Sequence, residues 1–96
     1  MGKEPLEDYR DYLGERLENE EFREAWEALE LGHQVARLRI MHGLTQEELA
    51  ERVGTKQPSI ARLESGQTEP KISFLRRVAE ALNGRLEVRI VPNDRT

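Results

Sequence analysis

The feature that most constrains the fold is a pair of short helices predicted between Thr45 and Gly66. Thr45 and Glu48 have the spacing of a capping box, which begins a helix. Gly54 ends that helix in a turn that needs a residue tolerant of positive φ. Pro58 suits the first turn of the next helix, where its missing N–H does no harm. Because the connection is short, the two helices must cross tightly, and the segment predicts a helix-turn-helix motif.

Hydrophobic periodicity predicts a helix on each side of this motif. Apolar residues follow helical spacing from His33 to His42, ahead of the motif. After the motif, Ser73 is placed to cap a helix that ends at Asn83 and Gly84. The chain from residue 33 to residue 84 therefore predicts a compact helical domain.

The first third of the chain predicts a two-helix arm. Pro5 suits the first position of one helix, and Asn19 can cap a second. The second helix carries one apolar stripe at helical spacing, formed by Phe22, Ala25, Trp26 and Leu29. Gly32 predicts a bend between this arm and the helix that follows.

Charge is distributed unevenly along the 96 residues, whose net charge is −4. Residues 1–32 carry a net charge of −7, residues 33–84 carry +2 and residues 85–96 carry +1. Such asymmetry indicates separate tasks for the segments. The acidic arm would repel phosphate, so we do not expect it to contact a nucleic acid.

After Gly84 the hydrophobic period changes from helical to two. Leu86, Val88 and Ile90 alternate with charged residues, which predicts one amphipathic strand. No second strand is predicted in the chain, and a lone strand leaves its backbone groups unpaired. The simplest expectation is that this strand pairs with the same strand of a second copy, giving a homodimer.

The motif resembles the Xre/lambdoid-repressor family of helix-turn-helix domains over about residues 33–82. The resemblance implies a mainly α, lambda-repressor-like five-helix DNA-binding domain, with the helix that begins near Gln57 in the major groove. It also implies that Gln46 holds a phosphate and that Arg39 and Glu64 form a partly buried structural ion pair. The matching residues are Gly43-Leu44-Thr45-Gln46, Leu49-Ala50, Gly54, Gln57, Ile60-Ala61-Arg62-Leu63-Glu64 and Gly66.

Side-chain chemistry supports the same interface independently. Gln57 can pair bidentately with adenine, and Lys56 or Arg62 with guanine, because their donors and acceptors match those base edges. The predicted base-reading residues are Lys56, Gln57, Ser59 and Arg62, and the predicted phosphate contacts are Gln46, Gln67, Thr68 and Lys71. Lys56 and Pro58 depart from the family pattern, in which a hydroxyl residue and a variable polar residue are usual.

The flanking segments resemble those of HigA-type antitoxins. This second resemblance rests on the acidic arm, on residues 57–64 and on the strand of residues 84–90. It implies a dimer that represses its own operon at a palindromic operator in double-stranded DNA. It also implies that the protein neutralises a small basic, RelE/HigB-like mRNA-cleaving toxin. Candidate toxin contacts are Tyr9, Tyr12, Leu13, Phe22 and Trp26, although the stripe of Phe22 and Trp26 can equally pack on the protein's own core.

Enzymatic and membrane functions are disfavoured. His33 and His42 lie nine residues apart, which is the wrong spacing for two metal ligands on one helix face, and the chain lacks cysteine and a glycine-rich phosphate loop. We therefore expect no enzymatic activity, no metal and no cofactor. No apolar run reaches the length of a membrane span, and the N-terminus lacks a signal-peptide pattern, so the expected location is the cytoplasm.

Three interpretations follow for the three predicted segments, namely an acidic helical arm (1–32), the DNA-binding domain (33–84) and a dimerising strand with a tail (85–96). The first is an antitoxin that also represses its own operon. The second is a stand-alone Xre-type transcriptional regulator whose arm is structural. The third is a protein-interaction module that does not bind DNA, which the exposed Lys56, Gln57 and Arg62 disfavour.

Overall fold

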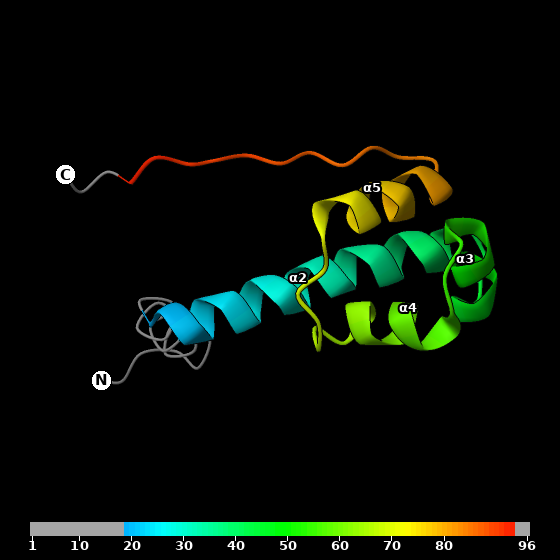
Figure 1. Cartoon of the computed structure of the whole chain (residues 1–96), viewed down its shortest axis with the longest axis horizontal. Coiled ribbons are helices and arrows are strands. Elements are labelled where there is room, and N and C mark those ends of the chain that lie inside the picture. Colours follow the sequence, from blue (N-terminus) through cyan, green and yellow to red (C-terminus); the bar gives the residue numbers. More distant parts are fainter. Residues whose placement is uncertain (1–18, 94–96) are drawn as a thin grey trace, which may run out of the picture.

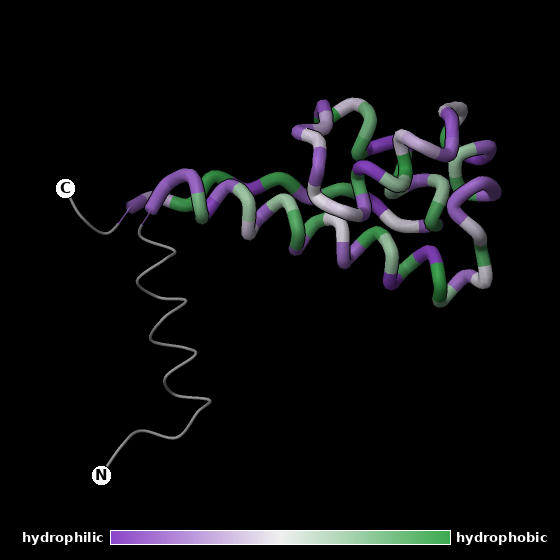
Figure 2. The backbone as a smooth tube through the Cα atoms, turned by 90° about the horizontal axis from the view of Figure 1, so that it is seen from below, coloured by the Kyte–Doolittle hydropathy of each residue, from purple (hydrophilic) through white to green (hydrophobic). Residues whose placement is uncertain are grey.

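The computed structural model describes residues 19–93, which are mainly α-helical (Figure 1). The helices are α2 (Glu20–Met41), α3 (Gln46–Val53), α4 (Gln57–Glu64) and α5 (Ile72–Ala81). Helix α2 packs against α4, and α3 packs against both α4 and α5. The three short helices gather on the C-terminal half of α2, and the N-terminal half extends beyond them (Figures 1 and 2).

Helix α2 begins where the sequence predicts a helix start. The side chain of Asn19 accepts a hydrogen bond from the Phe22 N–H at 3.1 Å, and Glu20 and Glu21 occupy the first turn. Acidic side chains there interact favourably with the positive end of the helix dipole. The helix then continues without a break to Met41.

The predicted bend at Gly32 is wrong, because Gly32 lies buried in the middle of α2. A Cβ atom at this position would lie 2.4 Å from the carbonyl oxygen of Glu64 and 2.6 Å from that of Leu63. Gly32 is therefore required by the close approach of α2 to the end of α4. The expected boundary between arm and domain at residue 32 falls inside this single helix.

The turn signals of the helix-turn-helix motif are confirmed. Thr45 Oγ1 accepts a hydrogen bond from the Glu48 N–H at 3.0 Å, and the Glu48 carboxylate accepts one from the Thr45 N–H at 3.0 Å. Gly54 ends α3 with a φ of 87°, and the first turn of α4 contains Pro58. Lys56 stands at the N-cap of α4 and makes no side-chain capping bond. The departure at Lys56 therefore leaves α4 without a side-chain cap.

A small apolar core holds the short helices on α2. Leu49 of α3 and Ile60 of α4 are completely buried, and Leu63 and Val78 are nearly so. Deleting such a side chain typically costs about 2–5 kcal/mol because it leaves a cavity. The remaining members of the core are Val35, Leu44, Ala50, Val53 and Leu82.

The start of α5 differs from the prediction. Helix α5 begins at Ile72 with Lys71 at its N-cap, so Ser73 lies one position inside the helix and does not cap it. The chain leaves α5 through Asn83, whose φ of 58° is left-handed. Asn is one of the residues that tolerate this conformation, which explains why the helix ends here as expected.

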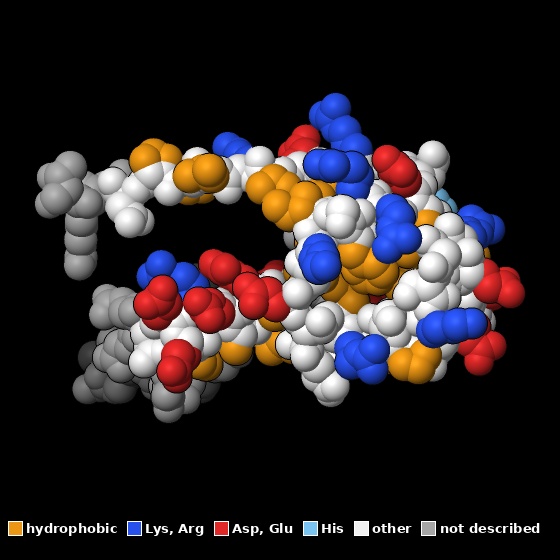
Figure 3. All heavy atoms as spheres, in the orientation of Figure 1, with side chains coloured by type: hydrophobic (Ala, Val, Ile, Leu, Met, Phe, Trp, Pro, Cys, Tyr) orange, Lys and Arg blue, Asp and Glu red, His pale blue; other side chains and the backbone are white. Residues whose placement is uncertain are grey.

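The expected fifth helix and the expected strand are both absent from residues 19–93. After α5, residues 84–93 have no regular secondary structure. Residues 85–93 run back toward the N-terminal end of α2, and open space separates the two segments on the face in Figure 3. A strand needs a neighbouring strand to supply its ladder, and the described residues contain none.

Candidate nucleic-acid interface

An ion pair links α2 to the end of α4. Arg39 donates from Nε to Glu64 Oε2 at 2.7 Å and from Nη2 to Glu64 Oε1 at 3.0 Å, and its Nη1 donates to the carbonyl oxygen of Leu44 at 2.8 Å. The side chains of Arg39 and Glu64 are only 14% and 7% exposed. The hydrogen bond to Glu64 raises the pKa of Arg39 above its ordinary value. The family resemblance implied an ion pair between these two residues, and they are joined in the structure.

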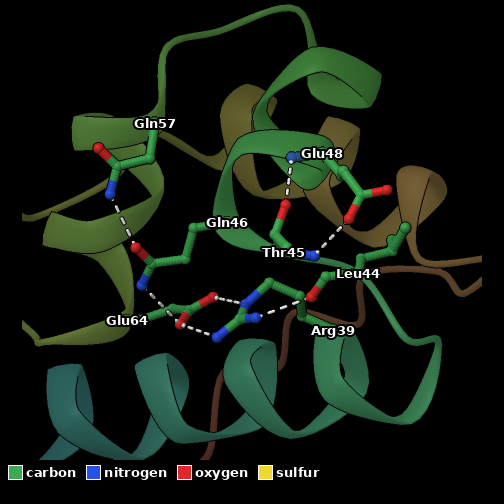
Figure 4. Close-up of polar contacts among 7 residues, drawn as sticks. All are labelled: Arg39, Leu44, Thr45, Gln46, Glu48, Gln57 and Glu64. Carbon is green, nitrogen blue, oxygen red and sulfur yellow. Dashed lines mark hydrogen bonds and ion pairs between the residues drawn. The ribbon is translucent and has the colours of Figure 1, made fainter.

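The same carboxylate organises two glutamine side chains (Figure 4). Gln46, the first residue of α3, donates from Nε2 to Glu64 Oε1 at 3.1 Å, and Gln57, the first residue of α4, donates from Nε2 to Gln46 Oε1 at 2.8 Å. A carboxylate only accepts hydrogen bonds, so Gln46 must turn its NH₂ toward Glu64 and its oxygen toward Gln57. The orientation of both amides therefore follows from the Arg39–Glu64 pair.

A groove between α4 and α5 collects four of the predicted DNA contacts. Ser59 and Arg62 of α4 line it together with Thr68 and Lys71 from the α4–α5 connection. Two of these were predicted to read bases and two to bind phosphates, so both kinds of contact share one surface. Arg62 and Lys71 are exposed, and Ser59 and Thr68 are half-buried.

The other predicted DNA contacts lie apart from this groove. Gln46 and Gln57 are half-buried in the polar network, and Lys56 is exposed at the start of α4. Gln67 lies on the opposite side of the α4–α5 connection, where it shares a second groove with Glu21 and Glu24 of α2. These carboxylates disfavour Gln67 as a phosphate contact, because carboxylates repel phosphate.

The predicted partner surfaces are less completely described. Tyr9, Tyr12 and Leu13 lie outside the described residues. Phe22 and Trp26 are half-buried on the N-terminal half of α2 and do not belong to the buried core cluster.

The side chains predicted to form the dimer strand are unevenly exposed. Leu86 is half-buried beside α2 and α5, whereas Val88 and Ile90 are 59% and 96% exposed. The apolar face of this segment therefore becomes more exposed toward its C-terminal end.

Two features of the interface escaped the sequence reasoning. The bond between Gln46 and Gln57 joins residues eleven positions apart, and its sequence signal is a glutamine at the first position of both motif helices. Arg77 of α5 also lines the α4–α5 groove, and its guanidinium carbon lies 5.6 Å from the centre of the Phe74 ring. Phe74 and Arg77 are three residues apart in a predicted helix, and this spacing could have indicated their contact.

No group of three or more His, Asp or Glu side chains within residues 19–93 is arranged to hold a metal ion. None of the four helices combines the length and apolar character needed to cross a membrane.

A tight crossing of α3 and α4, with polar side chains on the outer face of α4, defines a helix-turn-helix DNA-binding domain. The model of the HTH_3 helix-turn-helix family matches residues 35–88. The chain belongs to this family and is a helix-turn-helix transcriptional regulator, a class that is typically non-enzymatic.

Individual relatives agree with this class. The chain is 36% identical over 53 residues to an uncharacterized HTH-type transcriptional regulator of Archaeoglobus fulgidus, a match that covers 55% of this chain and 76% of that protein. It is 38% identical over 65 residues to the antitoxin HigA1 of Mycobacterium tuberculosis, covering 68% of this chain. That match spans only 44% of the antitoxin.

Solved structures show the same lambda-repressor-like fold. The restriction-modification controller protein C.AhdI from Aeromonas hydrophila matches with a TM-score of 0.62 and 26% identity over 64% of this chain and 88% of its own. The clp gene regulator ClgR from C. glutamicum matches with a TM-score of 0.60 and 29% identity over 62% and 76% of the two chains.

Proposed function

We propose that this protein is an antitoxin that represses its own operon as a homodimer bound to a palindromic operator. In this proposal it also neutralises a small basic, RelE/HigB-like mRNA-cleaving toxin. One observation carries the proposal. The same chain has a polar outer face on α4 that is suited to reading DNA and an acidic N-terminal half of α2 that extends beyond the domain. The similarity to HigA1 supports the same interpretation.

Gln57 is the central base-reading residue in this proposal. A glutamine amide has two N–H donors and one carbonyl oxygen, and Gln46 accepts one of those donors. One N–H and the oxygen remain, which is the pair that matches N7 and N6 of adenine. Because Gln46 and Glu64 hold the amide in place, less side-chain entropy is lost when it meets the base.

The remaining contacts divide into base reading and backbone contacts. Arg62 can read guanine, with Lys56 and Ser59 beside it on α4. The second N–H of Gln46 is available for a phosphate, and Thr68 and Lys71 add backbone contacts. Such backbone contacts position the protein without carrying sequence information.

The acidic half of α2 is the proposed toxin-binding surface. Glu21, Glu24 and Glu27 line the groove between α2 and the α4–α5 connection together with small apolar residues. On the face in Figure 3, acidic side chains crowd this half of α2. Charge complementarity attracts a basic protein, and half-buried Phe22 and Trp26 add apolar area to the contact.

The proposed test is co-purification with the product of the adjacent gene. We expect a small basic neighbour to be retained by the wild-type protein and lost from a Glu21→Gln, Glu24→Gln, Glu27→Gln variant. The matched control is Glu47→Gln, Glu51→Gln, Glu80→Gln, which removes three exposed acidic charges from α3 and α5 instead. Absence of a small basic neighbour, or equal retention by all three proteins, contradicts the antitoxin proposal.

A stand-alone transcriptional regulator is the second candidate. The observation that favours it is the match to C.AhdI, which covers 88% of that small controller protein. In this alternative the acidic arm only supports the domain, and the protein binds its own promoter without retaining any adjacent gene product.

A further inference from the structure

The groove between α4 and α5 contains cationic side chains that do not belong to α4. Its volume is about 480 Å³, and its lining includes the cations Arg62, Lys71 and Arg77 but only one carboxylate, Glu69. None of the three cations forms an ion pair within residues 19–93. Like charges gathered in one groove repel one another unless an anion binds among them.

Arg77 is held over this groove by its own helix. Its guanidinium carbon lies 5.6 Å from the centre of the Phe74 ring, one turn earlier on α5, and Phe74 packs against the buried core. A cation over an aromatic face is attracted to it, which restricts the arginine while leaving its N–H donors available. An arginine restricted in this way loses less entropy when it binds a phosphate.

The backbone and side chains around Arg77 favour the same anion. Helix α5 begins at the edge of the groove, and Lys71 at its N-cap makes no side-chain capping bond. Its first N–H groups add partial positive charge. Thr55 and Ser73 add hydroxyl donors to the lining. Guanidinium, ammonium, hydroxyl and helix N–H groups together are donors that bind phosphate oxygens.

We infer that the α4–α5 groove binds a phosphodiester of the DNA backbone and that Arg77 is a phosphate-contacting residue. The inference rests on the proposed reading of DNA by α4, because Ser59 and Arg62 on the reading face also line this groove. A strand that flanks the bases contacted by α4 continues along the groove toward α5. Arg77 contributes affinity there without base discrimination.

The test compares Arg77→Ala with the matched control Arg76→Ala, which removes an exposed arginine of α5 outside the groove. Binding is measured against salt for a duplex from the protein's own promoter and for a duplex of scrambled sequence. We expect Arg77→Ala to weaken binding to both duplexes by the same factor and to reduce the slope of log K against log salt by about 1. Arg76→Ala and Arg77→Lys should keep the wild-type slope.

Neutral methylphosphonate linkages, placed one at a time along the promoter duplex, provide a second readout. We expect one such linkage to weaken DNA binding by the wild-type protein and by Arg76→Ala. Binding by Arg77→Ala should be the same with and without that linkage. An unchanged slope in Arg77→Ala, equal slope losses in both alanine variants, or a loss confined to the promoter duplex overturns the inference. If the wild-type protein binds neither duplex, the proposed DNA reading by α4 is itself wrong.

Discussion

At the scale of single residues, Glu64 connects the core of the domain to its proposed DNA-reading face. It accepts hydrogen bonds from Arg39 and from Gln46, and Gln46 in turn accepts one from Gln57. No buried side-chain nitrogen or oxygen within residues 19–93 lacks a hydrogen-bond partner. A network satisfied in this way holds one arrangement, because any alternative leaves a buried polar group unpaired.

The first prediction concerns the residues that we propose to read the operator. Gln57→Ala and Arg62→Ala should each lower discrimination between the operator and a scrambled duplex by about 1–3 kcal/mol, since each removes a proposed base contact. Competition gel shifts measure this discrimination. Equal discrimination by both variants and the wild-type protein contradicts the assignment of α4 as the reading helix.

The second prediction concerns the capping box of α3. The backbone hydrogen bond from Thr45 lowers the pKa of Glu48 below its ordinary value of 4.5. A lowered carboxyl pKa in the folded state adds stability above pH 4.5, and that stability is lost as the pH falls through the lowered value. Urea midpoints of the wild-type protein and Glu48→Gln should therefore differ near pH 7 and converge in acid. A difference that does not depend on pH would exclude this ionisation as its source.

At the scale of helices, the contact between α2 and the end of α4 depends on a missing side chain. Gly32 lets the α2 backbone approach the carbonyl groups of Leu63 and Glu64 at the end of α4. Arg39, also on α2, binds the Glu64 side chain. Helix propensity alone favours alanine over glycine in the middle of a helix by about 1 kcal/mol. The close contact opposes this preference at residue 32.

The third prediction follows from that opposition. Gly32→Ala should lower the free energy of unfolding by about 1–3 kcal/mol. The added methyl group would clash with backbone carbonyl groups, which can move only if α4 shifts. Denaturant unfolding measures the change. The control Ala25→Gly, at an exposed position of α2, should cost only about 0.5–1 kcal/mol. A more stable Gly32→Ala variant would show that α4 can move away at little cost.

Local signals explain which helices could be predicted from the sequence. The capping box of Thr45 and Glu48 and the turn at Gly54 depend on residues within a few positions, so their spacing is visible in the chain. Gly32 could not be interpreted in this way, because its neighbours in space are residues 63 and 64. The spacing shows a glycine in an otherwise helical pattern, which equally indicates a bend or a close contact.

The candidate site was predictable in composition but not in geometry. The outward polar residues of α4 follow from helical periodicity once the motif is located. The link between Gln46 and Gln57 depends on the angle at which α3 crosses α4, which residue spacing does not give. Arg77 lies outside the motif and reaches the groove only through the packing of α5.

At the scale of the whole molecule, residues 85–93 are the segment that the fold leaves least supported. They run beside the domain without regular secondary structure, and Val88, Ile90 and Val91 are exposed. Apolar side chains and unpaired backbone groups in one extended segment favour pairing with another strand. The proposed second copy supplies that strand.

The fourth prediction tests this pairing. A chain truncated after Asn83 should be monomeric by light scattering, while a chain truncated after Asn93 should remain dimeric. The core ends at Leu82, so both truncated chains keep it, and circular dichroism should show unchanged helix content. A dimer that survives truncation after Asn83 places the interface elsewhere.

The continuous course of α2 also determines where this chain can change in length. Gly32 and Arg39 both face α4 and are seven residues apart, which is about two turns of helix. One inserted or deleted residue between them would rotate one relative to the other by about 100° and remove it from α4. Ala28 and Leu29 also lie close to Gly66, so this register extends back to residue 28 and is needed less toward the start of α2. Natural variants of this protein should therefore differ in the length of the acidic arm while keeping the spacing from Gly32 to Arg39 constant.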